Sequence, residues 1–219
     1  MAAHPARSDA PGQTLVSLVL IRHAETDLNA ARVLQWPDTP LGERGLAQAR
    51  AVAARFAGQP PAAILSSDMA RARQTAEAIA AATGRPVSIS PLLGERDFGA
   101  LRGQRYDQLG HDPIADERAP LGGESMAAFR ERVAAAFGWM LAQRRRAEGD
   151  LLVVTHGLVI RAILAAHARL PQGAEPPHAL ANTSVTVLDA EPPHAVRLAN
   201  CSRHLDPATR DDGRGVTGI

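Results

Sequence analysis

The sequence LVLIRHAETDLN, residues Leu18–Asn29, runs from an apolar segment directly into an arginine, a histidine and a cluster of small polar residues. It continues an apolar run that begins at Leu15 and is typical of a buried strand ending at Ile21. In open α/β sheets ligands bind outside the carboxyl ends of the strands, and Arg22 and His23 fall at such an end. A neutral histidine ring can attack phosphorus, and the planar fork of arginine matches phosphate oxygens. The pair is therefore predicted to be a nucleophile with a phosphate clamp.

Length and composition limit the class of protein. A chain of 219 residues with 45% hydrophobic residues suits one globular domain with a sizeable core. No apolar run approaches the roughly 20 residues of a membrane span, and the first residues lack the apolar core of a signal peptide. A net charge of +1 and 3% aromatic residues argue against a nucleic-acid partner. We expect a cytoplasmic protein that binds a small phosphorylated substrate and no membrane, and a homodimer stays open.

Two residue types narrow the chemistry further. The single cysteine, Cys201, excludes an internal disulfide and any multi-cysteine metal site. All 24 basic residues are arginine, so a P-loop lysine, a Schiff-base lysine and a kinase Lys–Glu pair are excluded. The histidines show no His-Glu-x-x-His spacing, and no metal site is predicted. Phosphate binding must therefore rest on arginine, histidine and backbone amides.

Strands and helices alternate along most of the chain. Strands are predicted at 15–21, 62–66, 87–89, 151–154, 184–188 and 195–198, and helices at 26–33, 42–56, 68–82, 125–146 and 158–168. Residues 91–123 show no period and are predicted to form a loop-rich excursion of the kind that covers or binds ligands. The alternation predicts an α/β fold, a three-layer α/β/α sandwich around a mostly parallel sheet. We expect one domain at 15–206, a flexible segment at 1–14 and a disordered tail at 207–219.

Three further segments carry groups suited to phosphate. Residues 66–76 follow the second strand and open a helix, where free amides and the helix dipole favour an anion. Arg71 lies about one turn inside that helix, and its side chain can reach the N-terminal end of the helix where an anion would bind. His156 follows the strand at 151–154, and Glu95 lies in the excursion. These groups extend the candidate phosphate site beyond Arg22 and His23.

With these residues in view, the chain resembles the histidine phosphatase superfamily, in the branch of the cofactor-dependent phosphoglycerate mutases and their phosphatase relatives. Five segments follow the family order: RHAET (22–26), PLGERG (40–45), SDMARA (67–72), GGES (122–125) and THG (155–157). The resemblance runs from Leu18 to about Leu205. It implies the phosphoglycerate mutase-like fold.

The resemblance also implies roles for single residues. It makes His23 the nucleophile that becomes phosphohistidine and Glu95 the general acid that protonates the leaving oxygen. It implies a phosphate or substrate site formed by Arg22, Thr26, Asn29, Gln35, Arg71 and His156. No cofactor is implied for a phosphatase, whereas a mutase would need a 2,3-bisphosphoglycerate primer. The physics agrees, because arginine and histidine donors stabilise the charge that phosphoryl transfer spreads over the equatorial oxygens.

This chain departs from the family pattern at positions that bear on whether it is a phosphatase or a mutase. The glycine common after Gln35 is absent, and we expect Trp36 to wall the pocket instead. The run from Glu95 to Leu101 is mutase-like, yet the paired arginines that mutases place later in the excursion have no counterpart, since Arg105 and Arg118 are single. We therefore predict a phosphomonoesterase. The alternatives are a phosphoglycerate mutase and, from another class, a non-catalytic sensor or interaction module for a phosphoryl ligand.

Overall fold

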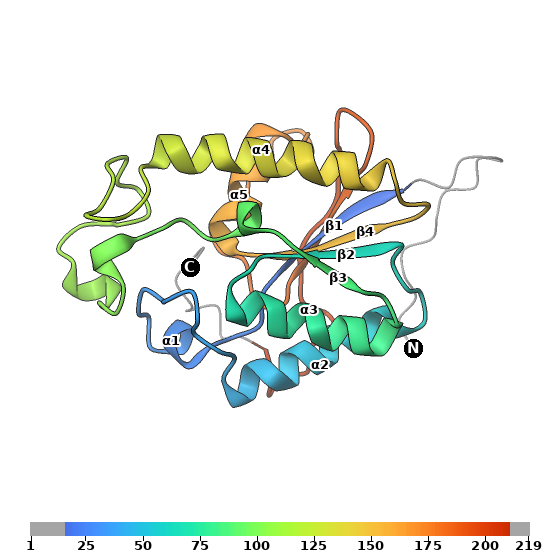
Figure 1. The fold of residues 1–219 in the computed structure, drawn as a ribbon, viewed down its shortest axis with the longest axis horizontal. Coiled ribbons are helices and arrows are strands. Elements are labelled where there is room, and N and C mark those ends of the chain that lie inside the picture. Colours follow the sequence, from blue (N-terminus) through green and yellow to red (C-terminus); the bar gives the residue numbers. More distant parts are fainter. Residues whose placement is uncertain (1–15, 211–219) are drawn as a thin grey trace.

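A computed structural model describes residues 16–210, and its centre is a six-stranded sheet (Figure 1). Its strands are β1 (Ser17–Arg22), β2 (Ala63–Ser66), β3 (Val87–Ile89), β4 (Leu151–Thr155), β5 (Val185–Asp189) and β6 (Val196–Cys201), in the order β3-β2-β4-β1-β5-β6. Four neighbours, β3, β2, β4 and β1, run parallel, and β5 and β6 are antiparallel to their neighbours. The predicted mostly parallel sheet is confirmed. The segment at 1–14, Leu15 and residues 211–219 lie outside the described residues.

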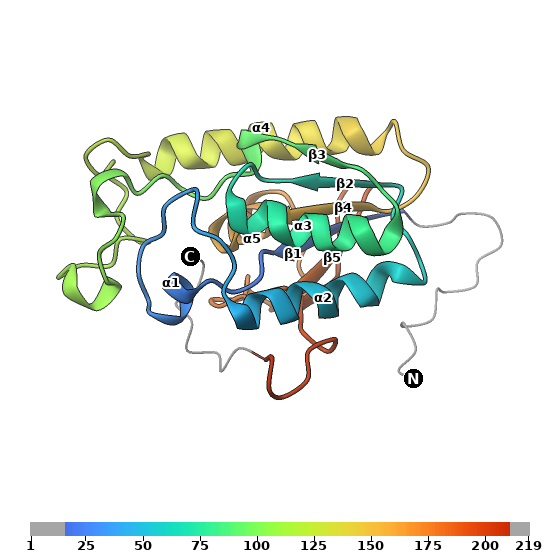
Figure 2. The same ribbon diagram turned by 60° about the horizontal axis from the view of Figure 1, so that its bottom comes forward.

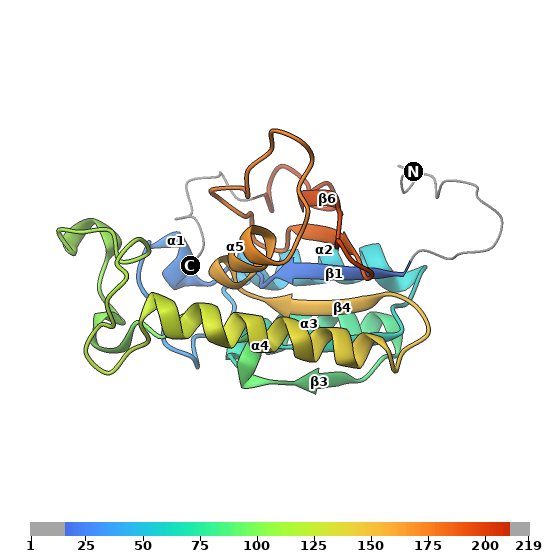
Figure 3. The same ribbon diagram turned by 90° about the horizontal axis from the view of Figure 1, so that it is seen from above.

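Helices cover both faces of the sheet because successive side chains of a strand point to opposite faces. Leu18 and Leu20 of β1 belong to the core cluster that includes α4 (Met126–Arg144) and α5 (Gly157–Ala166). Val19 and Ile21 belong to the cluster that includes α2 (Glu43–Ala57) and α3 (Ala70–Thr83). Figure 1 shows these two pairs of helices on opposite sides of the sheet, Figure 2 shows α2 and α3 side by side, and Figure 3 shows β3 and β6 at the two edges of the sheet. The three-layer α/β/α sandwich is confirmed.

The short helix after β1 ends earlier than predicted. α1 spans only Asp27–Ala30, and the Thr26 side chain caps it by accepting a hydrogen bond from the Asn29 N–H at 2.9 Å. Beyond it, Arg32 has a φ of 58°, and Val33 forms an isolated β-bridge with Arg105 of the excursion. The predicted helix at 26–33 is therefore wrong in its last turn, because a long-range pairing replaces it.

The other elements differ from the predicted ones mainly at their ends. α3 begins at Ala70, not at residue 68, because the Ser67 hydroxyl accepts the Met69 N–H at 3.2 Å in a turn that competes with the helix, and Met69 has the extended conformation of an N-cap. β6 continues to Cys201, three residues beyond the predicted strand. Within residues 16–210, no helix is long and apolar enough to cross a membrane.

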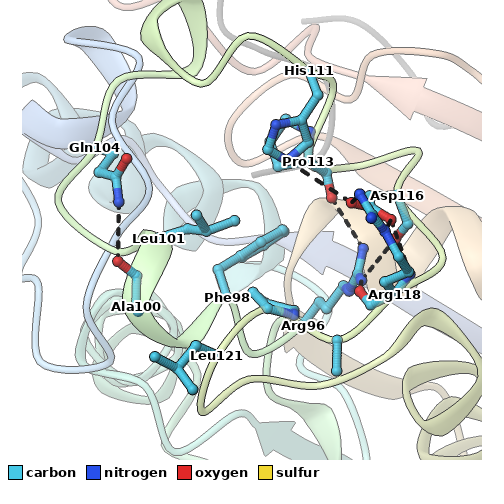
Figure 4. Close-up of a pocket in the computed structure, with 12 residues that line it drawn as sticks. Arg96, Phe98, Ala100, Leu101, Gln104, His111, Pro113, Asp116, Arg118 and Leu121 are labelled. Atoms are coloured by element: carbon cyan, nitrogen blue, oxygen red, sulfur yellow. Dashed lines mark hydrogen bonds and ion pairs between the residues drawn. The ribbon is translucent and has the colours of Figure 1, made fainter.

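The excursion at 91–123 contains only three short 3₁₀ turns, Pro91–Leu93, Gly99–Leu101 and Tyr106–Gln108, as predicted for a loop-rich segment. Two arginines hold it. The Arg96 guanidinium donates to the carbonyl oxygens of Pro113, Asp116, Arg118 and Glu124 at 2.8–3.0 Å, and Figure 4 shows Arg96 with several of these partners. Arg132 of α4 donates to the carbonyl oxygens of Leu92, Gly94 and Glu95 at 2.7–3.3 Å. These side chains fix the shape of the excursion together with backbone hydrogen bonds such as that from the Gly103 N–H to the Leu34 carbonyl oxygen at 2.7 Å.

Candidate functional site

The two predicted histidines meet at the carboxyl ends of β1 and β4. These strands are parallel neighbours with Arg22 beside Thr155, so the residues that follow, His23 and His156, emerge at one edge of the sheet. Their ring centroids lie 5.1 Å apart. Both histidines and Arg22 are buried. The sheet thus brings together residues more than 130 positions apart in the sequence.

The protonation of His23 leaves one ring nitrogen able to react. Its Nδ1 lies 2.7 Å from the Ala24 carbonyl oxygen, which can only accept, so Nδ1 carries the proton. The other nitrogen, Nε2, then keeps its lone pair, toward which Arg71 Nε points at 3.3 Å. Burial, followed by the charges of Arg71 and Arg22, holds the pKa of His23 well below its usual value of 6.5. The ring is therefore neutral, the form in which it can be a nucleophile.

A loop ahead of β5 holds the backbone of the Arg22–His23 pair. Asn182 Nδ2 donates to the His23 carbonyl oxygen at 3.0 Å, and the Thr183 N–H donates to the Arg22 carbonyl oxygen at 3.1 Å. Thr183 adopts a φ of 56°, a conformation unusual for a β-branched residue. The Arg22 guanidinium donates to the carbonyl oxygen of Leu180 in the same loop. The sequence analysis missed this loop, because only the antiparallel pairing of β5 with β1 brings it beside His23.

Arg71 is oriented by contacts on both sides of its guanidinium. Besides facing His23, it donates from Nη1 to the Trp36 carbonyl oxygen at 3.1 Å and from Nη2 to Met69 Sδ at 3.2 Å. Burial is the main cause that lowers the pKa of Arg71 to about 10, so it stays charged at neutral pH. The Trp36 ring lies against Gly103 of the excursion, where an added Cβ would come within 2.4 Å of it. Trp36 thus joins Arg71 to the excursion.

His156 is fixed by a serine to which the sequence analysis assigned no role. Ser67 Oγ lies 2.9 Å from His156 Nε2, accepts the Met69 N–H at 3.2 Å and can donate to the Asp68 carboxylate at 3.4 Å. When the hydroxyl instead donates across the shorter contact to Nε2, the neutral ring carries its own proton on Nδ1. This buried nitrogen has no hydrogen-bond partner in the described part of the chain. Burial, followed by the Arg71 and His23 charges, holds the pKa of His156 well below 6.5.

Glu95 enters the site from the excursion. Its carboxylate accepts the Arg96 N–H at 3.0 Å and the Leu158 N–H at 3.2 Å. Burial raises the pKa of Glu95 from 4.5 to about 7, and these hydrogen bonds and the Arg71 and Arg132 charges only partly oppose the shift. A carboxyl with such a pKa holds a proton close to neutral pH, as a general acid must.

The nearby carboxylates are already paired. Glu124 accepts two hydrogen bonds from Arg132, at 2.9 and 2.7 Å. Asp97 forms an ion pair with Arg102 at 2.7 Å. A hollow of about 660 Å³ beside Glu95 is lined by Asp97, Arg102, Glu124 and Arg132 among others. Glu95 is thus the carboxyl of this group that is buried and has a raised pKa.

The remaining predicted site residues form a buried hydrogen-bonded group after β1. The Thr26 hydroxyl accepts from the Asn29 N–H and donates to Gln35 Oε1 at 2.7 Å, and Asn29 Oδ1 accepts the Thr26 N–H at 3.3 Å. Thr26 therefore caps α1 and orients Gln35, whose buried Nε2 has no partner among residues 16–210. Thr155 Oγ1 donates to the Leu93 carbonyl oxygen at 2.7 Å, so its hydroxyl ties β4 to the excursion.

Tyr106 of the excursion is a further residue near the site that was not predicted from the sequence. Its hydroxyl is buried and has no hydrogen-bond partner within the described chain. Burial, then the charge of Glu95, raises its pKa, and Arg22 and Arg71 act in the opposite direction. Tyr106 therefore lies close enough to the phosphate-site residues to feel their charges. Among the described residues, no group of three or more His, Cys, Asp or Glu could hold a metal ion.

Comparison with known proteins agrees with this geometry. Residues 18–200 match the family model of the histidine phosphatase superfamily (branch 1). The chain is 31% identical over 215 residues to a probable phosphoglycerate mutase of Salmonella paratyphi C, covering 90% of this chain and 99% of the relative. Among solved structures, a mycobacterial glucosyl-3-phosphoglycerate phosphatase in complex with VO3 has 30% identity and a TM-score of 0.72, covering 85% of this chain and 100% of that one.

The same mycobacterial phosphatase in complex with inorganic phosphate is also similar, with 30% identity and a TM-score of 0.70 over 87% of this chain and 100% of that one. YhfR of Bacillus stearothermophilus has 28% identity and a TM-score of 0.72 over 87% of this chain and 99% of its own. The matches therefore extend over the whole sheet and both histidine segments. This chain belongs to the histidine phosphatase superfamily.

Proposed function

We propose that the protein is a phosphomonoesterase that hydrolyses a small phosphorylated metabolite through a phosphohistidine on His23. The observation that carries the proposal is the state of the His23 ring: neutral, with Nδ1 bonded to the Ala24 carbonyl oxygen and Nε2 directed at the Arg71 guanidinium. A phosphoryl group placed between Nε2 and Arg71 would meet a lone pair on one side and a cationic donor on the other. This is the arrangement that nucleophilic phosphoryl transfer needs.

In the first step, His23 Nε2 attacks phosphorus, a P–N bond forms and the ester P–O bond breaks. The Glu95 carboxyl gives its proton to the leaving alcohol oxygen, so a neutral alcohol departs. Arg22, Arg71 and the Nδ1–H of His156 stabilise the charge on the equatorial oxygens. The Ala24 carbonyl oxygen stabilises the positive charge that develops on the His23 ring through the Nδ1–H.

In the second step, water attacks the phosphohistidine and the P–N bond breaks. The Glu95 carboxylate takes one proton from that water, which returns it to its acid form, and inorganic phosphate leaves. No metal ion or organic cofactor has a role in either step, so dialysis against EDTA should leave the activity unchanged.

The mutase is the second candidate, favoured by the similarity to a probable phosphoglycerate mutase. It would use the same phosphohistidine and replace water by a second hydroxyl. We place it second because Arg96, the arginine that follows Glu95, is not directed at a substrate. Its guanidinium donates to the backbone carbonyl groups of Pro113, Asp116, Arg118 and Glu124. With 3-phosphoglycerate and its bisphosphate primer, isomerisation that outpaces phosphate release would reverse this order.

The test of the proposal is His23→Ala, with His111→Ala as a matched control on an exposed histidine of the excursion. We expect His23→Ala to lose at least about 10⁴-fold in phosphate release from para-nitrophenyl phosphate, because no nucleophile remains. Circular dichroism should show the fold intact. The wild-type protein, quenched during turnover, should carry an acid-labile and alkali-stable phosphoryl label that His23→Ala lacks. Phosphate binding without turnover in the wild type would favour the sensor instead.

A further inference from the structure

We propose that the site takes phosphate esters whose alcohol portion is uncharged and rich in hydroxyl groups, and that the Asp97–Arg102 ion pair makes it reject a carboxylate next to the reacting phosphoryl group. The inference rests on the proposed function and names its substrate class. Arg102 and Asp97 are then specificity-determining residues.

The position of Glu95 shows where the alcohol portion must lie. A general acid has to reach the leaving oxygen, so the group attached to that oxygen occupies the space next to the Glu95 carboxyl. That space is the hollow of about 660 Å³, whose lining also includes Asp68, Asp97 and Arg102. Arg102 lies near enough to Arg71 for its charge to lower the Arg71 pKa. The Asp97–Arg102 pair therefore lines the space that the alcohol portion would occupy.

Both arginines that line this hollow already have carboxylate partners. Arg102 Nη2 lies 2.7 Å from Asp97 Oδ1, and the same oxygen accepts the Gly99 N–H at 2.7 Å, which fixes the aspartate. Arg132 binds both oxygens of Glu124 as a fork, and its remaining N–H groups donate to carbonyl oxygens. A substrate carboxylate that replaced Asp97 or Glu124 would leave a protein carboxylate without its partner, and one that bound a remaining N–H of Arg102 would lie beside the negative charge of Asp97.

The other arginines of the excursion offer no replacement. Arg105 is paired with Asp107, and Arg118 with Asp116, each at 2.9 Å. Arg96 lines a separate hollow of about 330 Å³ in the excursion, shown in Figure 4, where its donors bind backbone carbonyl groups. Like charges brought together at a binding site repel each other, so Asp97 and Asp68 disfavour an anionic leaving group.

Neutral hydroxyl groups meet no such obstacle. A hydroxyl can donate to the second oxygen of Asp97 or accept from an N–H of Arg102 without separating the pair. The side chains are reachable, since 43% of Asp97 and 23% of Arg102 is exposed. The hollow thus suits a polyol or sugar-like alcohol.

The experiment compares two substrates that differ only in this charge. Racemic glycerol 3-phosphate and racemic 3-phosphoglycerate share one carbon skeleton and differ in a CH₂OH group against a carboxylate. We expect kcat/KM of the wild type to favour glycerol 3-phosphate by about tenfold or more. In Asp97→Asn the amide oxygen still accepts the Gly99 N–H but Arg102 loses its counter-ion, so the ratio should move at least about fivefold toward 3-phosphoglycerate.

Two control variants test whether the effect of Asp97→Asn comes from the Asp97–Arg102 pair or from a general change of charge. Asp107→Asn makes the same change in the exposed Arg105–Asp107 pair, which lies on the excursion but does not line the hollow, and should leave the ratio as in the wild type. Adding Arg102→Ala to Asp97→Asn should remove the gain on 3-phosphoglycerate.

Each contrary result has a distinct meaning. The inference is overturned if the wild type hydrolyses 3-phosphoglycerate as well as glycerol 3-phosphate, or if Asp97→Asn and Asp107→Asn shift the ratio equally. In both cases para-nitrophenyl phosphate would still be hydrolysed, and the proposed function would stand. If no ester is hydrolysed, including para-nitrophenyl phosphate, the proposed function fails and the inference fails with it.

Discussion

The floor of the site and its roof are built in different ways. The floor consists of Arg22, His23, Ser67, Arg71 and His156, which lie at the ends of β1, β2 and β4 and at the start of α3. The backbone ladders of the sheet set their spacing. The roof is the excursion at 91–123, which forms no strand of the sheet and whose backbone is held by the side chains of two arginines and by scattered backbone hydrogen bonds.

This difference assigns different tasks to the two regions. The floor groups are rigid, buried and directed at one point, as stabilisation of a single transition state requires. The roof carries Glu95, Tyr106 and the Asp97–Arg102 pair on irregular backbone, which tolerates sequence change better than a sheet does. We therefore expect floor variants to lower activity on every ester, whereas roof variants should change which ester is hydrolysed.

Arg71→Ala should show the largest effect of the three variants that follow. It removes a preorganised donor from the floor, and we expect kcat/KM to fall about 10²- to 10³-fold on alkyl and aryl phosphates alike. Steady-state kinetics on both esters measures this. Arg73→Ala, an exposed arginine of the same helix, is the matched control and should stay near the wild type. A loss confined to one class of ester would contradict the division between floor and roof.

Glu95→Gln, a variant of the roof, should slow the hydrolysis of one class of ester much more than that of the other. We expect about a 10²-fold loss on alkyl phosphates but only a few-fold loss on para-nitrophenyl phosphate, whose leaving group needs little protonation. Under the proposed mechanism the acid form of Glu95 is the active one, and its pKa is raised to about 7, so we expect activity on alkyl phosphates below pH 7 and its loss as pH rises through that value.

The rate on alkyl phosphates divided by the rate on aryl phosphates reports the pKa of Glu95, because ionisation of the substrate phosphate changes both rates and cancels in the ratio. In the wild type the ratio should fall about tenfold per pH unit above pH 7, and in Glu95→Gln it should not change with pH. Equal losses on both esters would remove Glu95 from the role of acid.

Ser67→Ala should show the smallest effect. It removes the hydroxyl that directs the proton of His156 to Nδ1, so part of the population takes the other tautomer. We expect kcat to fall about tenfold on both classes of ester with KM little changed, which corresponds to one hydrogen bond of roughly 1.4 kcal/mol. Ser67→Thr, which keeps the hydroxyl, should restore most of the rate. Failure of this rescue, with unchanged stability, would argue against tautomer control.

The sequence predicted the floor well because its signals are local. An apolar strand followed at once by Arg22 and His23, and another followed by His156, already places these side chains at strand ends. The residues that hold the floor were missed. Asn182 lies 159 positions from His23, and nothing around it marks a hydrogen bond to the His23 carbonyl oxygen.

The roof was predicted only as a loop-rich excursion with one acid. Residues Arg96, Arg102 and Arg132 are ordinary arginines in the sequence, and their partners follow from the path of the chain. The error at the end of α1 has the same origin, since Val33 pairs with Arg105, a residue 72 positions away, instead of continuing the helix.

The α/β sandwich, the family and the residue types at the strand ends could all be predicted from the sequence, because hydrophobic periodicity and motif order are properties of neighbouring residues. The protonation states and the ion pairs could not, because they depend on the folded arrangement. The neutral His23, the raised pKa of Glu95 and the paired Arg102 all depend on burial and on distances between segments far apart in the chain. Those quantities exist only once the sheet has formed and the excursion has closed over it.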